Sequence, residues 1–446
     1  MTATLAEVLH TFGPDYLAAH ALSTAQARVW RAIVACRTPA LGGRHQQCDQ
    51  CGIEQWLFNS CGNRHCPQCQ SGARDPWRQA QLAQLLPVPY CHLVLTLPHA
   101  LNALAAVHPR WVYRTLMQCA AATLSEFAAN PRWLGAMGAF TLVLHTWTQD
   151  LRRHVHVHAL MACGGLDDED HWVAPKRSPT FLFPVHALSK VFRGKFLDAL
   201  DSAQRDGALP HDPSNTPAQR RARHAELTRH DWVVYAKTAL AGPALVLDYL
   251  SRYTHRVAVS NERIAGITGG AVRLRVRADD HGGKRSVFID GAQFIGRFLL
   301  HVLPPGFMRI RHYGLLSPAL KTERLAIARA ALAMPPANAQ AREDAAAFLK
   351  RVAGIDIANC PHHQRAGCHF LLHFPGRAPG DSQAVRTPGV QHLAVGAVEP
   401  AGRAQVGRLA VDHEGSPARL TGVAAERQAL VARQVGRVLR RAARFR

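Results

Sequence analysis

Residues 154–158 read His-Val-His-Val-His, a strict alternation of histidine and valine. Because side chains alternate between the two faces of a β-strand, a strand here would place all three imidazoles on one side. The β-rich run 140–147 precedes it across a polar turn and carries His145, so an antiparallel hairpin would bring His145 opposite His156. We therefore expect His145, His156 and His158 to converge as a divalent-metal site.

Imidazole ligands favour zinc, copper or manganese over magnesium by intrinsic affinity. Beside a phosphodiester, a bound ion acts as a Lewis acid on the phosphate and positions it, while a protein hydroxyl can make the attack. The chain contains 26 histidines, so an inert, solvent-facing strand is the competing interpretation. The apolar residues on both sides of the alternation argue against a surface strand.

Tyr249 and Tyr253 are four residues apart, which places two phenols one turn apart on the same face of a helix. A phenol has a pKa of about 10, so attack by its oxygen needs a nearby cation, and Arg252 and Arg256 could provide one and bind phosphate. A packing pair of aromatic rings is the alternative interpretation. With the histidine strand beside them, the two tyrosines are candidate nucleophiles that can each hold one DNA strand.

Five of the 11 cysteines fall within 22 residues, which in a reduced compartment indicates metal binding rather than disulfides. The pattern contains two Cys-x2-Cys pairs 14 residues apart, typical of one tetrahedral structural zinc. The predicted ligands are Cys48, Cys51, Cys66 and Cys69.

Other cysteines and histidines near this segment leave further sites open. Cys36, His45, Cys61 and His65 could bind a second, interleaved zinc, or could pack and hydrogen-bond locally. Arg64 lies inside the cluster and is a candidate DNA contact. A later, irregularly spaced set could also hold a metal: Cys360, His362, His363 and Cys368.

The chain has 446 residues, a formal net charge of +22 and a pI of about 10.3. Such an excess of positive charge favours a nucleic-acid partner, although a GC-rich genome also enriches arginine. Residues 1–20 lack a basic start followed by an apolar run, and no stretch approaches the ~20 apolar residues of a membrane span. We expect a cytoplasmic, nucleoid-associated bacterial protein with no membrane partner.

Helices and strands must together position these groups, so the predicted fold class is α+β. Helical periodicity covers most of 1–35, 103–129, 186–203, 243–253 and 291–302, with a polar helix at 73–86. Strands are expected at 90–97, 140–147, 154–163, 232–235, 255–259, 271–277 and 285–289. We divide the chain into a helical and zinc-binding domain at 1–86, a nuclease domain at 87–320, a helical extension at 321–374 and a basic, largely unstructured tail at 375–446.

In combination, these motifs resemble the two-tyrosine, paired-histidine (HUH) rolling-circle transposases of bacterial insertion sequences, the IS91-like group. The resemblance covers roughly residues 30–320 and departs from the family at Val155, where proline is common, and in the tail. It is carried by the segments 36–43, 59–70, 145–149, 154–158, 249–261, 298–307 and 309–314.

The resemblance implies an HUH core, with an antiparallel sheet carrying His156 and His158 and a nucleophile helix carrying Tyr249 and Tyr253. His145 matches the place where related nickases often carry a third ligand. The implied activity is nicking and rejoining of single-stranded DNA at mobile-element ends through a 5′-phosphotyrosine intermediate, with structural zinc and catalytic Mg²⁺ or Mn²⁺. No Gly-x4-Gly-Lys-Ser/Thr motif occurs, so we expect a host helicase or the replication machinery to separate the strands.

Three other functions compete with this interpretation. A non-enzymatic zinc-ribbon regulator would bind DNA without forming a covalent product. A three-carboxylate nuclease would need acids on separate elements, whereas the acidic run 167–170 lies in one loop. A tyrosine recombinase would place its Arg and His residues ahead of one late tyrosine, whereas here His255 and Arg256 follow the pair.

Overall fold

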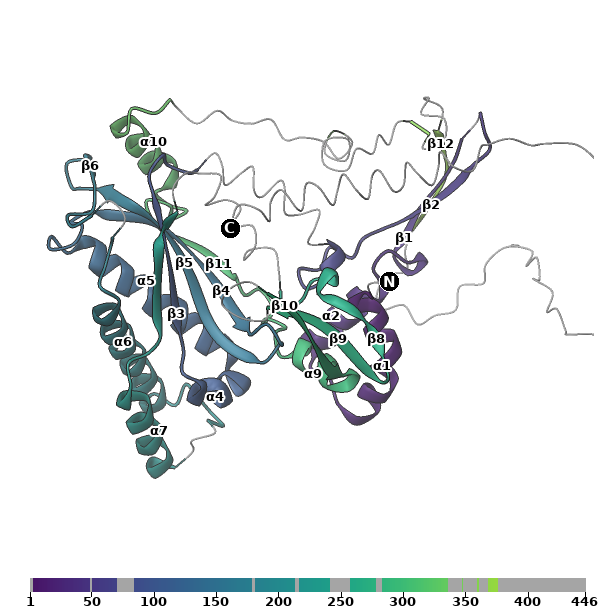
Figure 1. Ribbon diagram of the computed structural model, residues 1–446, viewed down its shortest axis with the longest axis horizontal. Coiled ribbons are helices and arrows are strands. Elements are labelled where there is room, and N and C mark those ends of the chain that lie inside the picture. Colours follow the sequence, from purple (N-terminus) through teal and green to yellow (C-terminus); the bar gives the residue numbers. More distant parts are fainter. Residues whose placement is uncertain are drawn as a thin grey trace, which may run out of the picture. The chain divides into compact units, whose positions relative to one another are not determined.

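The computed structural model describes residues 3–48, 50–69, 84–178, 181–212, 216–240, 257–277, 283–335, 347, 359–360 and 368–375. It describes the backbone alone at residues 237–240, 284 and 368–375. Within these ranges the strands form three antiparallel sheets (Figure 1).

The largest sheet carries the histidine strand. Its order is β11-β4-β5-β3-β7, with β6 paired to the end of β5. The strands are β3 (Tyr90–Thr96), β4 (Met137–Trp147), β5 (Arg153–Leu166), β6 (Trp172–Val173), β7 (Val234–Leu240) and β11 (Ile310–Gly314). The expected hairpin of β4 and β5 is therefore confirmed, and it occupies the middle of the sheet.

Helices cover one face of this sheet (Figure 1). Val155 and Val157 of β5 point into a core that also contains residues of α5 and α6, such as Leu116 and Phe192. These helices follow from amphipathic sequences that bury one side. The helices around this core are α4 (Asn102–Val107), α5 (Pro109–Ala129), α6 (Val185–Arg205) and α7 (Pro217–Arg229), after the short η2 (His99–Leu101).

A second sheet forms a smaller unit with the N-terminal helices. Its order is β10-β9-β8, and its inner face packs on α1, α2 and α9 around one apolar core. Capping boxes at Thr4 and Ser23 begin the two N-terminal helices, because the side chains of Glu7 and Gln26 accept hydrogen bonds from the backbone amides of the two cap residues. The elements are α1 (Leu5–Ala19), α2 (Thr24–Ala35), η3 (Asn261–Arg263), β8 (Ile264–Thr268), β9 (Ala271–Arg277), β10 (Lys284–Asp290) and α9 (Gly291–Leu299).

The third sheet joins distant parts of the sequence. Its order is β12-β1-β2, formed by β1 (Gly42–Cys48), β2 (Glu54–Phe58) and β12 (Cys368–Pro375) after η1 (Pro39–Leu41). The sequence patterns did not predict these strands. Residues 368–374, assigned above to a helical extension, pair with β1 instead, as does Pro375 at the start of the predicted tail, while α10 (Lys321–Ala331) is the helical part of that extension.

One predicted strand is corrected. The expected strand at 255–259 is not extended over its described part, because Ala258 has a φ of 62° in the left-handed region, and β8 begins only at Ile264. The helix expected at 291–302 ends at Leu299. The helix expected at 243–253 lies outside the described residues, as does most of the helix expected at 73–86. Among the helices that are described, none combines the length and hydropathy needed to cross a membrane.

Candidate functional site

The three predicted histidines converge on the large sheet. His145 of β4 lies directly opposite His156 of β5, and His158 follows two residues later on the same face. Their ligand nitrogens all lie within 4.8 Å of one another. The Nε2 atoms of His156 and His158 are 3.1 Å apart, and the ring centroids of His145 and His158 are 4.4 Å apart.

The strand pattern explains why this cluster is ordered. Val155 and Val157 are anchored in the apolar core, so the alternate histidines must face the other way. Both His145 and His156 are buried. The ring of His145 also stacks on Trp147, with centroids 4.5 Å apart, which limits its rotation.

Burial keeps the imidazoles of His156 and His158 neutral. Desolvation lowers the pKa of His156 to about 4 and holds the pKa of His158 well below its usual value. A neutral imidazole offers a lone pair to a metal ion. Two lone pairs 3.1 Å apart would repel, so a proton or a cation must lie between the Nε2 atoms of His156 and His158. The donor set therefore fits a divalent ion that accepts nitrogen ligands.

A further histidine, His92 of β3, was missed by the sequence analysis. Its Nε2 lies 2.9 Å from Nδ1 of His158, and the two rings stack with centroids 5.2 Å apart. His156 makes a comparable bond, from Nδ1 to the His154 carbonyl at 3.0 Å. Both contacts occupy Nδ1 and leave Nε2 for an ion, as outer partners of metal-binding histidines commonly do. The available signal was the position of His92 in the expected strand 90–97.

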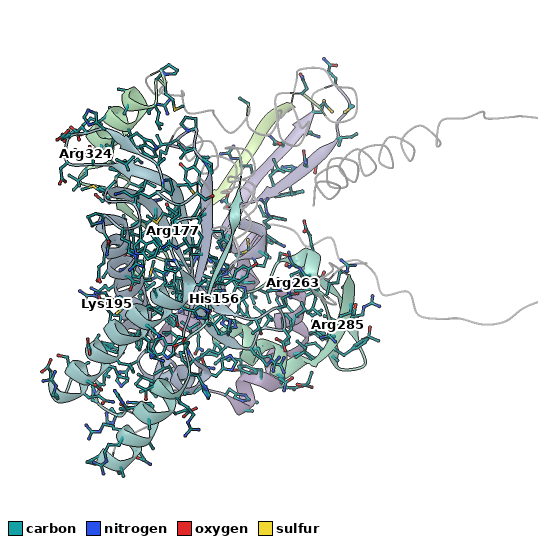
Figure 2. The ribbon with its side chains drawn as sticks, turned by 60° about the vertical axis from the view of Figure 1, so that its left-hand side comes forward. His156, Arg177, Lys195, Arg263, Arg285 and Arg324 are labelled. Atoms are coloured by element: carbon teal, nitrogen blue, oxygen red, sulfur yellow. The ribbon has the colours of Figure 1, made fainter. Side chains whose placement is uncertain are left out.

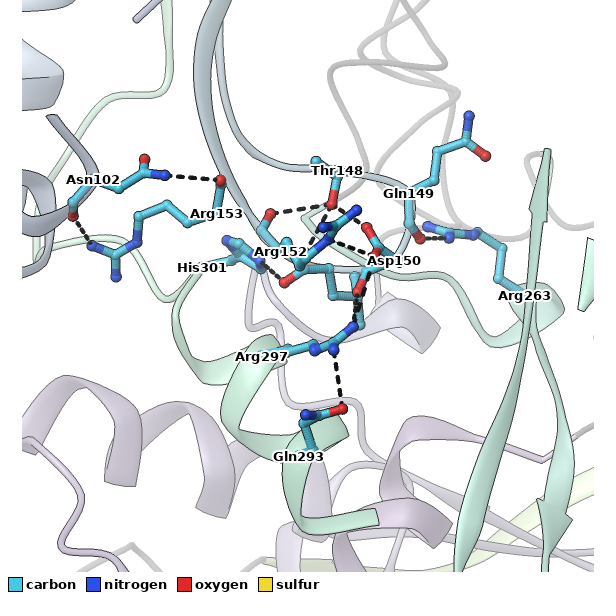
Figure 3. Close-up of polar contacts among 11 residues, drawn as sticks. Asn102, Thr148, Gln149, Asp150, Arg152, Arg153, Arg263, Gln293, Arg297 and His301 are labelled. Carbon is cyan, nitrogen blue, oxygen red and sulfur yellow. Dashed lines mark hydrogen bonds and ion pairs between the residues drawn. The ribbon is translucent and has the colours of Figure 1, made fainter. Parts of the chain in front are cut away.

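The turn of the β4–β5 hairpin is clamped by the smaller unit (Figure 3). Arg297 of α9 donates to the Asp150 carbonyl at 2.9 Å, and Arg263 donates to the Gln149 carbonyl. His301, 1% exposed, contacts the Leu151 carbonyl through Nε2 and the Thr146 hydroxyl through Nδ1, both at 3.0 Å. These bonds fix the strand end that carries His145.

The predicted nucleophiles lie outside the described residues. Tyr249 and Tyr253 fall there, as do the candidate phosphate ligands Arg252 and Arg256. Arg64 is described, and its guanidinium donates to the carbonyls of Phe307 at 2.6 Å and Pro304 at 3.4 Å.

One cysteine cluster contains four thiols. It is formed by Cys36, Cys61, Cys66 and Cys69, whose sulfurs all lie within 4.8 Å of one another. Cys69 lies 3.5 Å from both Cys36 and Cys61. A tetrahedral ion with Zn–S bonds of about 2.3 Å separates its sulfurs by about 3.8 Å, so the cluster fits zinc. A hydrogen bond from Cys61 lowers the pKa of Cys66 to about 5, which favours the thiolate that zinc requires.

This grouping differs from the one expected from the sequence. Each Cys-x2-Cys pair stays together, but the pair Cys48 and Cys51 joins Cys360 rather than Cys66 and Cys69. The reason is the extended path of β1: Cys36 caps the end of α2, whereas Cys48 is the last residue of a strand that rises about 3.3 Å per residue from Gly42.

The two histidines of the expected second zinc site are placed elsewhere. His45 lies 3.1 Å from the Glu54 carboxylate and stacks on Trp56. His65 contacts Asn63 through Nδ1 and accepts the Leu303 amide through Nε2 at 3.3 Å. Neither ring joins a cysteine cluster in the described part of the chain.

Comparisons with known proteins agree with these features. Residues 138–324 match a family model described as "Putative transposase", and residues 8–97 match one described as "Transposase zinc-binding domain". The "Putative transposase y4qJ" of Sinorhizobium fredii is 43% identical over 375 residues, covering 82% of this chain and 92% of the relative. The "Transposase for insertion sequence element IS801" of Pseudomonas savastanoi pv. phaseolicola is 29% identical, covering 64% of this chain and 68% of the relative.

A solved structure titled "Conjugative Relaxase TrwC in complex with oriT DNA, metal-bound structure" also matches. It covers 57% of this chain and 96% of its own, with 11% identity and a TM-score of 0.24.

Proposed function

Because the chain belongs to the IS91-like family of transposases with an N-terminal zinc-binding domain, we propose that it cuts and rejoins single-stranded DNA at the ends of a mobile element. The observation that carries the proposal is the convergence of His145, His156 and His158 on one face of the sheet. Tyr249 and Tyr253 are the proposed nucleophiles. In this proposal Cys36, Cys61, Cys66 and Cys69 hold the structural zinc of the N-terminal domain.

The chemistry balances without ATP. The phenol oxygen of one tyrosine attacks the phosphorus, the bond from phosphorus to the 3′ oxygen breaks, and that oxygen leaves as a 3′ hydroxyl with a proton. The 5′ phosphate stays on the tyrosine, so the bond energy is kept for rejoining to another 3′ hydroxyl. A divalent ion held by the histidines, Mn²⁺ or Mg²⁺ in this proposal, supplies Lewis acidity at the scissile phosphate.

The second tyrosine lets one chain hold two strands. While the first phenol is linked to one 5′ phosphate, the second can attack another strand, which an exchange between element and target requires. The hairpin clamp serves the same reaction, because Arg297 and His301 fix the strand end that presents His145.

The outer face of the small sheet is the proposed path for DNA. Arg273, Arg275 and Arg277 alternate along β9 and are exposed, while the residues between them are buried. Phe288 of β10, paired with Arg273, is 64% exposed. Surfaces that bind single-stranded nucleic acid combine arginines that contact the phosphate backbone with aromatic rings that stack on bases.

This face adjoins the histidine hairpin. The side-chain oxygen of Gln149, in the hairpin turn, accepts the backbone amide of Arg277 at 2.5 Å. In Figure 2, Arg285 lies on the small sheet, Arg263 in η3 directly before that sheet, and His156 on the large sheet. A single DNA strand bound across these arginines would therefore pass close to the end of the β4–β5 hairpin that carries His145 and His156.

The decisive experiment traps the covalent product. Purified protein is mixed with single-stranded oligonucleotides from its element ends, labelled at the 5′ or the 3′ end, with and without Mn²⁺, and run on a denaturing protein gel. We expect a metal-dependent adduct that carries only the 3′ label. The adduct should disappear in the Tyr249→Phe/Tyr253→Phe double variant and fall sharply in His156→Ala.

Tyr235→Phe is the matched control, because Tyr235 is a half-exposed phenol on β7, which β3 separates from the histidine strand β5. It should form the adduct at the normal rate. A folded, zinc-loaded wild type that binds the oligonucleotide but forms no adduct would contradict the proposal and favour a DNA-binding regulator. We also propose that a host helicase or the replication machinery separates the DNA strands. ATP-driven unwinding of duplex DNA by the pure protein would contradict this dependence on the host.

A further inference from the structure

A second group of thiols joins the two ends of the described chain. Cys48 and Cys51 lie at the β1–β2 turn, and Cys360 comes from a segment more than 300 residues later. Their sulfurs all lie within 4.8 Å of one another, with Cys51 and Cys360 3.7 Å apart. Cys48 and Cys360 are each 1% exposed. The matched family model for the zinc-binding domain ends at residue 97, so it does not include Cys360.

The turn between β1 and β2 has the form of a zinc knuckle. The Gly52 amide donates to the Cys48 carbonyl at 2.8 Å, and Gly52 has a φ of 67°, a conformation that glycine adopts without strain. The Cys48 amide donates to the Ile53 carbonyl at 3.0 Å. This tight turn presents the sulfurs of Cys48 and Cys51 to a common point, where Cys360 meets them.

Strand pairing brings a fourth cysteine to the same place. β12 runs antiparallel to β1, and its register sets Cys368 directly opposite Cys48. Directly opposed residues of an antiparallel pair have Cβ atoms about 4.5–5.5 Å apart, which is within reach of a shared zinc. The pairing is continuous from Cys48 to Gly42 apart from one irregularity at His45 and Gln46, so the register rests on the whole strand.

We propose that Cys48, Cys51, Cys360 and Cys368 bind a second structural zinc ion, which ties the chain beyond the nuclease domain back to the N-terminal sheet. The Cys51–Cys360 separation of 3.7 Å matches the edge of a zinc–sulfur tetrahedron, about 3.8 Å, and greatly exceeds a disulfide of about 2.05 Å. The ion closes a very long loop of chain, so it stabilises the pairing of β12 with β1. This inference does not depend on the proposed nuclease activity.

Zinc content tests the site directly. Full-length protein carrying His156→Ala, so that the histidine cluster adds no zinc, and purified without chelator should contain two zinc ions per chain by elemental mass spectrometry, one for each thiol cluster. In this His156→Ala background, Cys360→Ser and Cys368→Ser should each lose one ion, Cys61→Ser should lose the other, and Cys360→Ser/Cys61→Ser should retain none. Cys119→Ser is the matched control, because Cys119 is a buried thiol of α5 outside both clusters, and it should keep both ions.

A readout in the wild type avoids variants that fail to fold. Hydrogen exchange at 42–48 and 368–375, and alkylation of Cys360 and Cys368, should be slow in the zinc-loaded protein and fast after a chelator removes the ion. One zinc ion per chain in the His156→Ala protein, or two after Cys360→Ser is added to it, would overturn the site. Retention of both ions in Cys368→Ser, with unchanged exchange at 42–48, would overturn Cys368 as the fourth ligand.

Discussion

Replacing His301 tests whether the hairpin clamp stabilises the fold as its contacts indicate. The ring is 1% exposed and makes two hydrogen bonds, to the Leu151 carbonyl and the Thr146 hydroxyl. His301→Ala leaves the buried Leu151 carbonyl without this donor, at about 1–3 kcal/mol, and opens a cavity, at about 2–5 kcal/mol for a large-to-alanine change. Together these contributions predict that the free energy of unfolding falls by at least about 3 kcal/mol.

The assay is urea unfolding at pH 7.5, followed by tryptophan fluorescence, since Trp147 lies 5.9 Å from the His301 ring between centroids. His186→Ala is the matched control, because the His186 side chain is 91% exposed, and its effect should stay within about 0.5 kcal/mol. A loss below about 1 kcal/mol for His301→Ala would refute the reasoning, because the carbonyl would then have found another donor at no cost.

The same variant predicts a pH dependence. Burial lowers the pKa of His301 to about 4, below the ordinary value of about 6.5 that the unfolded chain would show. Between these values the unfolded state binds the proton and the folded state does not, so wild-type stability falls as the pH decreases from 6.5 towards 4. At pH 5.5 this loss is about 1.4 kcal/mol, and the alanine variant lacks it. The difference between the two proteins should therefore shrink by that amount between pH 7.5 and 5.5, and a constant difference would contradict the shifted pKa.

Three more variants test other contacts. His92→Phe removes the partner that orients His158 and should weaken Mn²⁺ binding by about 10–100-fold in calorimetry, whereas unchanged affinity would remove His92 from the site. Alanine at all three exposed arginines of β9 should weaken binding of a single-stranded oligonucleotide and reduce the slope of log K against log salt by about 2, whereas an unchanged slope would exclude this face. Arg223→Leu removes the guanidinium that donates to the buried Asp212 carboxylate at 2.7 and 2.8 Å, and should lower the free energy of unfolding in urea by about 3–5 kcal/mol. Arg221→Leu, on the exposed side of α7, should change it by almost nothing.

The histidine site could be predicted because its signal is local. A period of two in residues 154–158 fixes which side chains share a face, and a short polar turn fixes which strand lies alongside. The role of His92 was harder to predict, because α4, α5 and β4 separate its strand β3 from β5 in the sequence. A lone histidine in a strand carries no periodic signal, and its partner is decided by the order of strands in the sheet.

The composition of the cysteine clusters could not be predicted from local sequence patterns alone. The spacing of two residues reliably predicts which sulfurs form a pair, because a tight turn enforces it, and both pairs are intact. It does not determine which other donors share an ion with each pair, since the two pairs and the single cysteines can be combined in several ways with the same local geometry. Here the end of α2 supplies Cys36 to one pair, and the pairing of β12 with β1 brings Cys360 towards the other. Both choices depend on contacts distant in sequence, and the second spans nearly the whole described chain, so no pattern within residues 36–72 could have contained it.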